Sequence, residues 1–144
     1  QREGERMSNI SVTVGRVLLG LYFLLPGLMK AAGPAQTVAY METHDIAFAT
    51  PLMWIATVTN ILGGLFLIAG RHVKVVAYGF VVYVLLVNFM LHDFWNVGED
   101  MVERETQNFI KNLAILAGLM VLAGFSPARS IGLAGWWRSD KAAA

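Results

Sequence analysis

Long apolar stretches alternate with short polar segments along the chain. Four stretches contain almost only apolar residues, and they run over Ile10–Met29, Pro51–Ala69, Val75–Leu91 and Phe109–Phe125. A helix needs roughly 20 apolar residues, with a lower limit near 17, to cross the hydrocarbon core of a bilayer. Each stretch is long enough, so the pattern predicts four membrane-spanning helices.

The spacing of the apolar residues distinguishes helices from a membrane barrel. Lipid-exposed backbone must satisfy its own hydrogen bonds, which leaves helices or closed barrels. Barrel strands alternate apolar and polar residues, and these stretches do not. We therefore expect an all-α transmembrane four-helix bundle over residues 10–125, an N-terminal tail at 1–9 and a C-terminal tail at 126–144. The hydrophobic fraction of 56% agrees with this fold class, as does the mean hydropathy of +0.56.

Basic residues are distributed unevenly between the two sides of this bundle. Three lie on one side, among seven acidic residues, and they are Lys30, Arg104 and Lys111. Seven lie on the other side, and they are Arg2, Arg6, Arg71, Lys74, Arg129, Arg138 and Lys141. Since cytoplasmic loops carry the excess of Lys and Arg, both termini are predicted in the cytoplasm of a bacterial cell, with the chain in the inner membrane.

The connections between the spans differ in length. The middle one, Gly70–His72, is tight and makes spans two and three antiparallel neighbours. The first connection, residues 30–50, opens with Gly33-Pro34, and its apolar Val38, Met41 and Phe48 predict a short helix on the membrane surface. The third, residues 92–107, is acidic and is expected to be a loop.

Polar residues inside the spans indicate a function, because placing an ionisable side chain inside the membrane costs several kcal/mol. In the first span they share one helical face with two glycines, at the spacing of three or four that aligns side chains. That face comprises Arg16, Gly20, Phe23, Gly27 and Lys30. It combines a cation near each membrane surface with glycines that allow close contact between helices.

Further polar residues gather where the third span ends and the fourth begins. By the predicted topology they lie at the outer end of the bundle with Lys30, and they are His92, Asp93, Trp95, Asn108, Lys111 and Asn112. We expect these residues to converge on one pocket, and Arg16 is counted with them as a candidate ligand-binding residue. Snorkelling to the interface is the alternative for each lysine, and for Arg16, taken alone. Asn60, in the middle of the second span, is expected to link helices by a hydrogen bond.

The absence of cysteine from the sequence restricts the chemistry. Thiol–disulfide exchange, Cys-ligated iron–sulfur clusters and covalent haem attachment are excluded. No metal site is predicted, because His44, His92 and the nearby carboxylates show no recognised ligand spacing. No nucleic-acid partner is expected, and the net charge is only +1.

Three segments resemble the DoxX family of small membrane proteins. Residues 16–30 are similar to its opening helix, His92-Asp93-Phe94-Trp95 resembles its His-x-Phe-Trp element, and residues 107–115 resemble its Asn-x-x-Lys-Asn-Leu helix start. The resemblance extends over nearly all of Val14–Phe125. It implies a four-helix transmembrane fold, and some members of the family are subunits of quinone-linked sulfur-oxidising enzymes.

Three functions remain open at this point. In the first, the chain is a subunit of a quinone-linked redox system, with Lys30, His92, Trp95, Asn108 and Lys111 as donors to a quinone and electrons supplied by a partner. In the second, it is a non-catalytic accessory subunit of a larger membrane complex, or a homo-oligomer. In the third, it binds or carries a small anionic or lipidic ligand, since lysines suit a carboxylate or phosphate better than a neutral quinone.

Overall fold

The computed structural model describes residues 2–128 and residue 140. All the regular secondary structure within these residues is helical, and four of the helices are long and apolar enough to span a membrane. The helices are α1 (Arg2–Ala32), α2 (Pro34–Glu42), α3 (Ala49–Ala69), α4 (Val73–Leu91) and α5 (Glu99–Phe125), with a single 3-10 turn η1 (Phe94–Asn96) before α5. The predicted all-α fold with four membrane helices is confirmed.

The membrane helices extend beyond the apolar stretches that predict them. Helix α1 begins at Arg2, and its 31 residues give a length of about 46 Å at 1.5 Å per residue. The segment at residues 2–9 is therefore a helical extension of the first span. Helix α5 begins at Glu99, so the expectation of a loop through residue 107 is wrong for residues 99–107. Residues 2–9 and 99–107 are predominantly polar, so they lack the apolar periodicity from which a helix is predicted.

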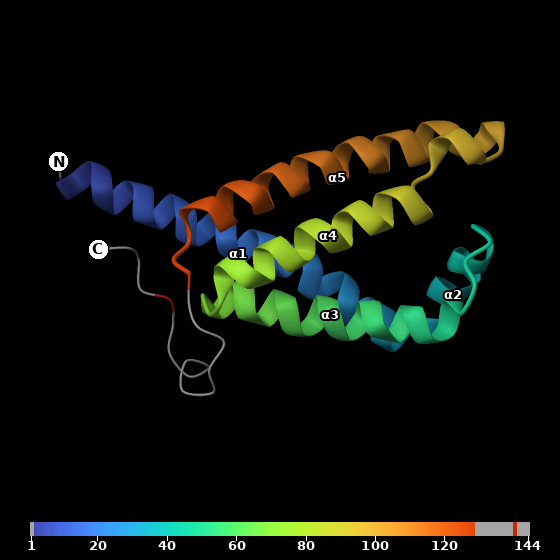
Figure 1. The fold of residues 1–144 in the computed structure, drawn as a ribbon, viewed down its shortest axis with the longest axis horizontal. Helices are drawn as coiled ribbons and strands as arrows, with labels where there is room; N and C mark the ends of the chain where they lie inside the picture. The colour runs from blue at the N-terminus through green and yellow to red at the C-terminus, as the bar shows by residue number, and fades with distance from the viewer. Residues whose placement is uncertain (1, 129–139, 141–144) are drawn as a thin grey trace.

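The two ends of the bundle are distinct (Figure 1). One end carries the start of α1, the turn between α3 and α4, and the end of α5; we call it the closed end. The other carries α2 and the connection between α4 and α5; we call it the pocket end. The arrangement places the start of α1 and the end of α5 together, as predicted, whereas their cytoplasmic side stays a prediction. Three of the basic residues on which it rests, Arg129, Arg138 and Lys141, lie outside the described residues.

Helices α1 and α3 approach each other closely through glycine. A Cβ built on Gly64 would lie 2.8 Å from both the Gly20 carbonyl oxygen and the Leu24 backbone nitrogen, and one on Gly27 would lie 2.9 Å from Asn60 Cβ. The predicted role of Gly20 and Gly27 in close helix contact is confirmed.

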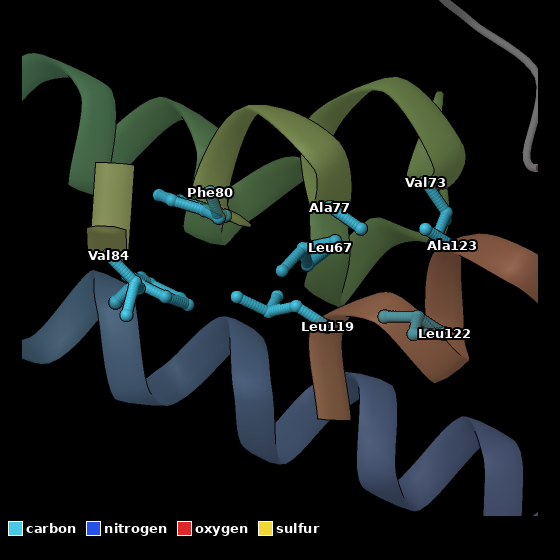
Figure 2. Packing of buried hydrophobic residues seen from close by; sticks show 9 residues of the cluster. Leu67, Val73, Ala77, Phe80, Val84, Leu119, Leu122 and Ala123 are labelled. Atoms are coloured by element: carbon cyan, nitrogen blue, oxygen red, sulfur yellow. The ribbon is translucent and has the colours of Figure 1, made fainter. Parts of the chain in front are cut away.

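The apolar core lies at the level where all four long helices meet. Side chains from α3, α4 and α5, among them Leu67, Phe80 and Leu119, converge beside α1 (Figure 2). Phe23 of α1 stacks on Phe80 of α4 with ring centroids 3.7 Å apart. This contact ties the α1–α3 pair to the α4–α5 pair.

At the closed end, polar groups satisfy the helix termini. Gly70 ends α3 with a left-handed backbone (φ +68°), and the Arg71 N–H bonds the Phe66 carbonyl in a Schellman arrangement. The Arg16 guanidinium donates to the Leu67 carbonyl and, at 2.9 Å, to the Ile68 carbonyl. The Asp140 carboxylate accepts from the N–H groups of His72 (3.2 Å) and Val73 (2.9 Å) at the start of α4. A cation thus sits at a helix C-terminus and an anion at an N-terminus, which the helix dipoles favour.

The predicted surface helix is present as α2. Its Met41 is buried in a small apolar cluster with Ala49 and Met53 of α3, so α2 is attached to the end of α3. Phe48 was expected to be part of this helix and instead lies outside it, 81% exposed. Helix α2 covers the pocket end of the bundle.

Candidate functional site

A cavity of about 460 Å³ opens at the pocket end, between the long helices and α2. All five helices contribute to its wall. The chemically active side chains that line it are Tyr22, Lys30, Tyr40, Asn60, Tyr83, His92, Asn108, Lys111 and Asn112. Phe23, Val84, Val87 and Leu91 add an apolar wall. We call this cavity the polar pocket.

The charge of the polar pocket is positive. Lys30 of α1 and Lys111 of α5 line it, and no aspartate or glutamate of residues 2–128 or 140 does. Neither lysine forms a hydrogen bond or an ion pair within the part of the chain that the structure describes. Lys30 is half-buried, whereas Lys111 is exposed. Two cations therefore share one cavity without a counterion from the described chain.

Behind the pocket, Glu105 is fully buried and accepts hydrogen bonds on both oxygens. The Tyr40 hydroxyl donates to Oε1 at 2.9 Å, and His92 Nδ1 donates to Oε2 at 2.6 Å. Because an ionised carboxylate only accepts, Nδ1 of His92 carries the proton, and Nε2 has no partner in the described chain. The three side chains join α2, the end of α4 and α5. We call them the Glu105 cluster.

Burial, followed by the hydrogen bond to Glu105, raises the pKa of the Tyr40 hydroxyl above its ordinary value. The phenol therefore keeps its proton throughout the physiological range. It acts as a fixed donor to the Glu105 carboxylate.

A second carboxylate–histidine pair holds the two connections at the pocket end together. Asp93, after α4, lies 2.8 Å from Nδ1 of His44, after α2. The His44 side chain is almost completely buried, and its ring packs edge-on against Tyr40. This pair fixes α2 over the pocket and takes no part in its lining.

The deeper wall of the pocket contains amides and tyrosines. The Tyr22 hydroxyl of α1 donates to Asn112 Oδ1 of α5 at 3.0 Å. Asn60 lies against the Tyr83 hydroxyl, but its buried Oδ1 accepts no hydrogen bond. Asn60 was expected to link helices rather than to contact a ligand; it lies against Tyr83 of α4, and its side chain also lines the pocket.

Five of the eight residues proposed from the sequence line the polar pocket, namely Lys30, His92, Asn108, Lys111 and Asn112. The other three do not. Arg16 lies at the closed end and binds the α3 carbonyls. Asp93 points to His44, and Trp95 is 56% exposed in an aromatic cluster with Phe89 and Phe109. The chain leaves the helical conformation after His92, so Asp93 and Trp95, which lies in η1, do not share its direction.

Sequence reasoning missed Glu105 and Tyr40. Glu105 was counted among the acidic residues of an expected loop. It lies three residues before Asn108 and seven before Asn112, which is the spacing of one helical face, and this register was the available signal. Tyr40 gave no comparable signal, because its partner lies 65 residues away. Within the described residues, no three His, Cys, Asp or Glu side chains are grouped so that they could hold a metal ion.

Comparison with known proteins identifies the family. Residues 11–93, which run from α1 through α4, match DoxX. The chain belongs to the DoxX family. It is 25% identical to the inner membrane protein YphA of Escherichia coli (strain K12) over 118 residues, which cover 82% of this chain and 84% of YphA. No solved structure matches it. This DoxX protein is a multi-pass protein of the bacterial inner membrane.

Proposed function

We propose that this DoxX protein binds a small anionic ligand in the polar pocket. The observation that carries the proposal is the pair Lys30 and Lys111, which line one cavity of about 460 Å³ without a carboxylate in its wall. Two acidic side chains beside the pocket are already engaged, Asp93 by His44 and Glu105 by Tyr40 and His92. A ligand anion is therefore the natural counterion.

Energetics favour an anion over a neutral ligand. A cation at membrane depth costs several kcal/mol unless it is paired. Hydrogen bonds between charged groups are roughly twice as strong as those between neutral groups. The unsatisfied Asn60 Oδ1 adds an acceptor for a hydroxyl or water that accompanies the ligand. A carboxylate or a phosphate fits this set of groups.

Native mass spectrometry of the full chain released from its own membranes tests the proposal. We expect a bound anionic molecule on the wild-type protein and its loss in Lys30→Ala and in Lys111→Ala. Lys74→Ala is the matched control, because Lys74 lies in the first turn of α4 at the closed end. Equal retention in all four proteins, or no anion in any of them, contradicts the proposal.

A quinone-linked redox role is the second candidate, and the Glu105 cluster supports it. Reduction of a quinone to a quinol takes two electrons and two protons. His92 lines the pocket and bonds a buried carboxylate through Nδ1, so a further proton taken up on Nε2 can pass to a bound head group, and solvent supplies the second proton. Lys30, Asn108 and Lys111 can donate to quinone carbonyls, and a partner subunit supplies the electrons. A neutral quinone in the same spectra, lost in His92→Ala or in Lys30→Ala and retained in the Lys74→Ala control, favours this candidate.

A further inference from the structure

A second cavity lies directly beside the polar pocket and differs from it in chemistry. It has a volume of about 580 Å³, lies between α1 and α5, and is lined almost entirely by apolar side chains, including Val12, Leu19, Ile115, Val121 and Phe125. The guanidinium of Arg16 also borders it, but this group is held by the α3 carbonyls. We call this cavity the α1–α5 groove.

The groove exists because α1 and α5 are not close partners. Helix α1 packs against α3 through glycines, and α5 packs against α4. Gly15 and Gly118 line the groove and place no side chain in it. A Cβ on Gly15 would meet nothing within 4 Å, and one on Gly118 would meet only Leu19 at 3.9 Å. The space is therefore open and can be filled without disturbing the backbone.

Tyr22 joins the groove to the polar pocket. It is the residue that lines both cavities. Its hydroxyl donates to Asn112 at 3.0 Å, so one hydrogen bond between α1 and α5 lies where the two cavities adjoin. On one side of this bond lie the two lysines, which have no partner among residues 2–128 and 140, and on the other lies the apolar α1–α5 groove. The two cavities together match a ligand that has a charged head and an apolar chain.

We propose that the ligand is a single-chain anionic amphiphile drawn from the bilayer. Its head lies between Lys30 and Lys111, and its chain passes the Tyr22–Asn112 bond into the α1–α5 groove. This inference rests on the proposed binding of an anion and adds the chain, its location and a lateral route of entry.

The length of the groove agrees with one lipid chain. From Val12 to Tyr22 on α1, ten steps of 1.5 Å give about 15 Å. Lys30 lies eight steps beyond Tyr22 on the same helix, so the path from the head to the far end of the groove measures about 27 Å, which is close to the roughly 30 Å of the hydrocarbon core. A small water-soluble anion has no apolar chain with which to fill this groove. The lysines of the adjoining pocket complement an acidic head, which a neutral lipid lacks.

Photolabelling tests this inference with the full chain in nanodiscs of neutral phosphatidylcholine. The probe is a sixteen-carbon fatty acid that carries a diazirine at the end of its chain, and labelled peptides are mapped by mass spectrometry. We expect labels to concentrate on residues 12–22 and 115–125. Lys30→Ala should lower this labelling about tenfold, the equivalent of one charge-assisted hydrogen bond.

Filling the groove supplies a matched pair of variants. Gly15→Phe places a ring in the groove and should abolish labelling there. Gly79→Phe is the control, because a Cβ at Gly79 also meets nothing within 4 Å and this residue, on α4, lies outside both cavities. Equal unfolding temperatures of the two variants establish that both fold.

Each contrary result has its own meaning. Labels spread evenly over all lipid-facing helices, or groove labelling that ignores Lys30→Ala, overturn the inference, because the chain is then ordinary surrounding lipid. Crosslinks from the groove to a second copy of the protein overturn it in favour of an oligomer interface. If the groove labelling fails but anionic molecules still copurify and are lost in Lys30→Ala, the proposal of a bound anion stands and the proposal that its acyl chain lies in the groove is refuted. If none copurify, the anion proposal itself fails.

Discussion

The charged side chains at the two ends of the bundle differ in whether they have partners within the described residues. At the closed end, Arg16 binds the carbonyls that terminate α3, and Asp140 binds the N–H groups that begin α4. At the pocket end, Lys30 and Lys111 have no partner in the described chain, although they line one cavity. Charge at the closed end stabilises the fold. The two lysines of the polar pocket make no such stabilising contact, and we therefore propose that they bind a ligand.

The pocket end itself contains both kinds of group. Glu105 and Asp93 are paired with histidines and fix the surrounding segments, whereas the two lysines have no partner among the residues that the structure describes. A fixed wall around unpaired donors is what a preorganised binding site requires, because less ordering is needed when the ligand arrives. The comparison therefore predicts that variants separate into those that change stability and those that change binding.

The largest loss of stability is expected for Glu105→Ala. The substitution leaves His92 and Tyr40 without their shared acceptor at a buried position. We expect a decrease of about 3 kcal/mol in the free energy of unfolding, since breaking a buried pair leaves an uncompensated polar group. Chemical unfolding in detergent micelles measures it. Glu103→Ala, an exposed carboxylate on the same helix, should change little; an equal effect of the two would refute the structural role of the cluster.

Arg16→Ala is expected to cost somewhat less. It removes two charge-assisted hydrogen bonds from the end of α3, for a loss of about 2 kcal/mol. The bound anion should be retained, because Arg16 lies outside the polar pocket. Unfolding and native mass spectrometry of the same preparation give both numbers. Loss of the anion with unchanged stability would reverse the assignment of the two ends.

Gly64→Ala tests the packing that both ends share. A methyl group there meets backbone atoms of α1 at 2.8 Å, which cannot rotate away. Overpacking of this kind costs roughly 1–3 kcal/mol, so we expect about 2. Gly79→Ala is the control, because it meets nothing within 4 Å. Equal stability of the two variants would show that α1 and α3 are not held together as closely as described.

The smallest effect concerns the pH dependence contributed by Tyr40. The pKa of its hydroxyl is raised in the folded protein above the ordinary value near 10. Its stabilising hydrogen bond is therefore fully present below pH 10 and is lost as the pH rises from there through the folded pKa. Tyr40→Phe should cost about 1 kcal/mol at neutral pH and remove this alkaline loss. Unfolding at pH 7 and pH 11 measures it; an unchanged alkaline loss in Tyr40→Phe would contradict the assignment.

The sequence predicts the membrane helices well, because apolar length is a direct requirement of the bilayer. It also predicts that Lys30, His92, Asn108, Lys111 and Asn112 share one end, since helical spacing and topology suffice for that. The Glu105 cluster is not predicted, because the helical extension of α5 beyond the membrane is polar and its partners come from distant segments. Arg16 is misassigned for a related reason. Its spacing places it on the face of Lys30, but the end of α3, with its free carbonyls, decides its role.

The central claim is that the polar pocket holds free positive charge for an anion. The most direct measurement is the change in unfolding temperature when phosphate or butyrate is added to the wild-type protein, Lys30→Ala and Arg16→Ala. A ligand that binds only the folded state raises this temperature. We expect a rise in the wild type and in Arg16→Ala, and none in Lys30→Ala. An equal rise in all three proteins, or none in the wild type with either anion, would contradict the claim.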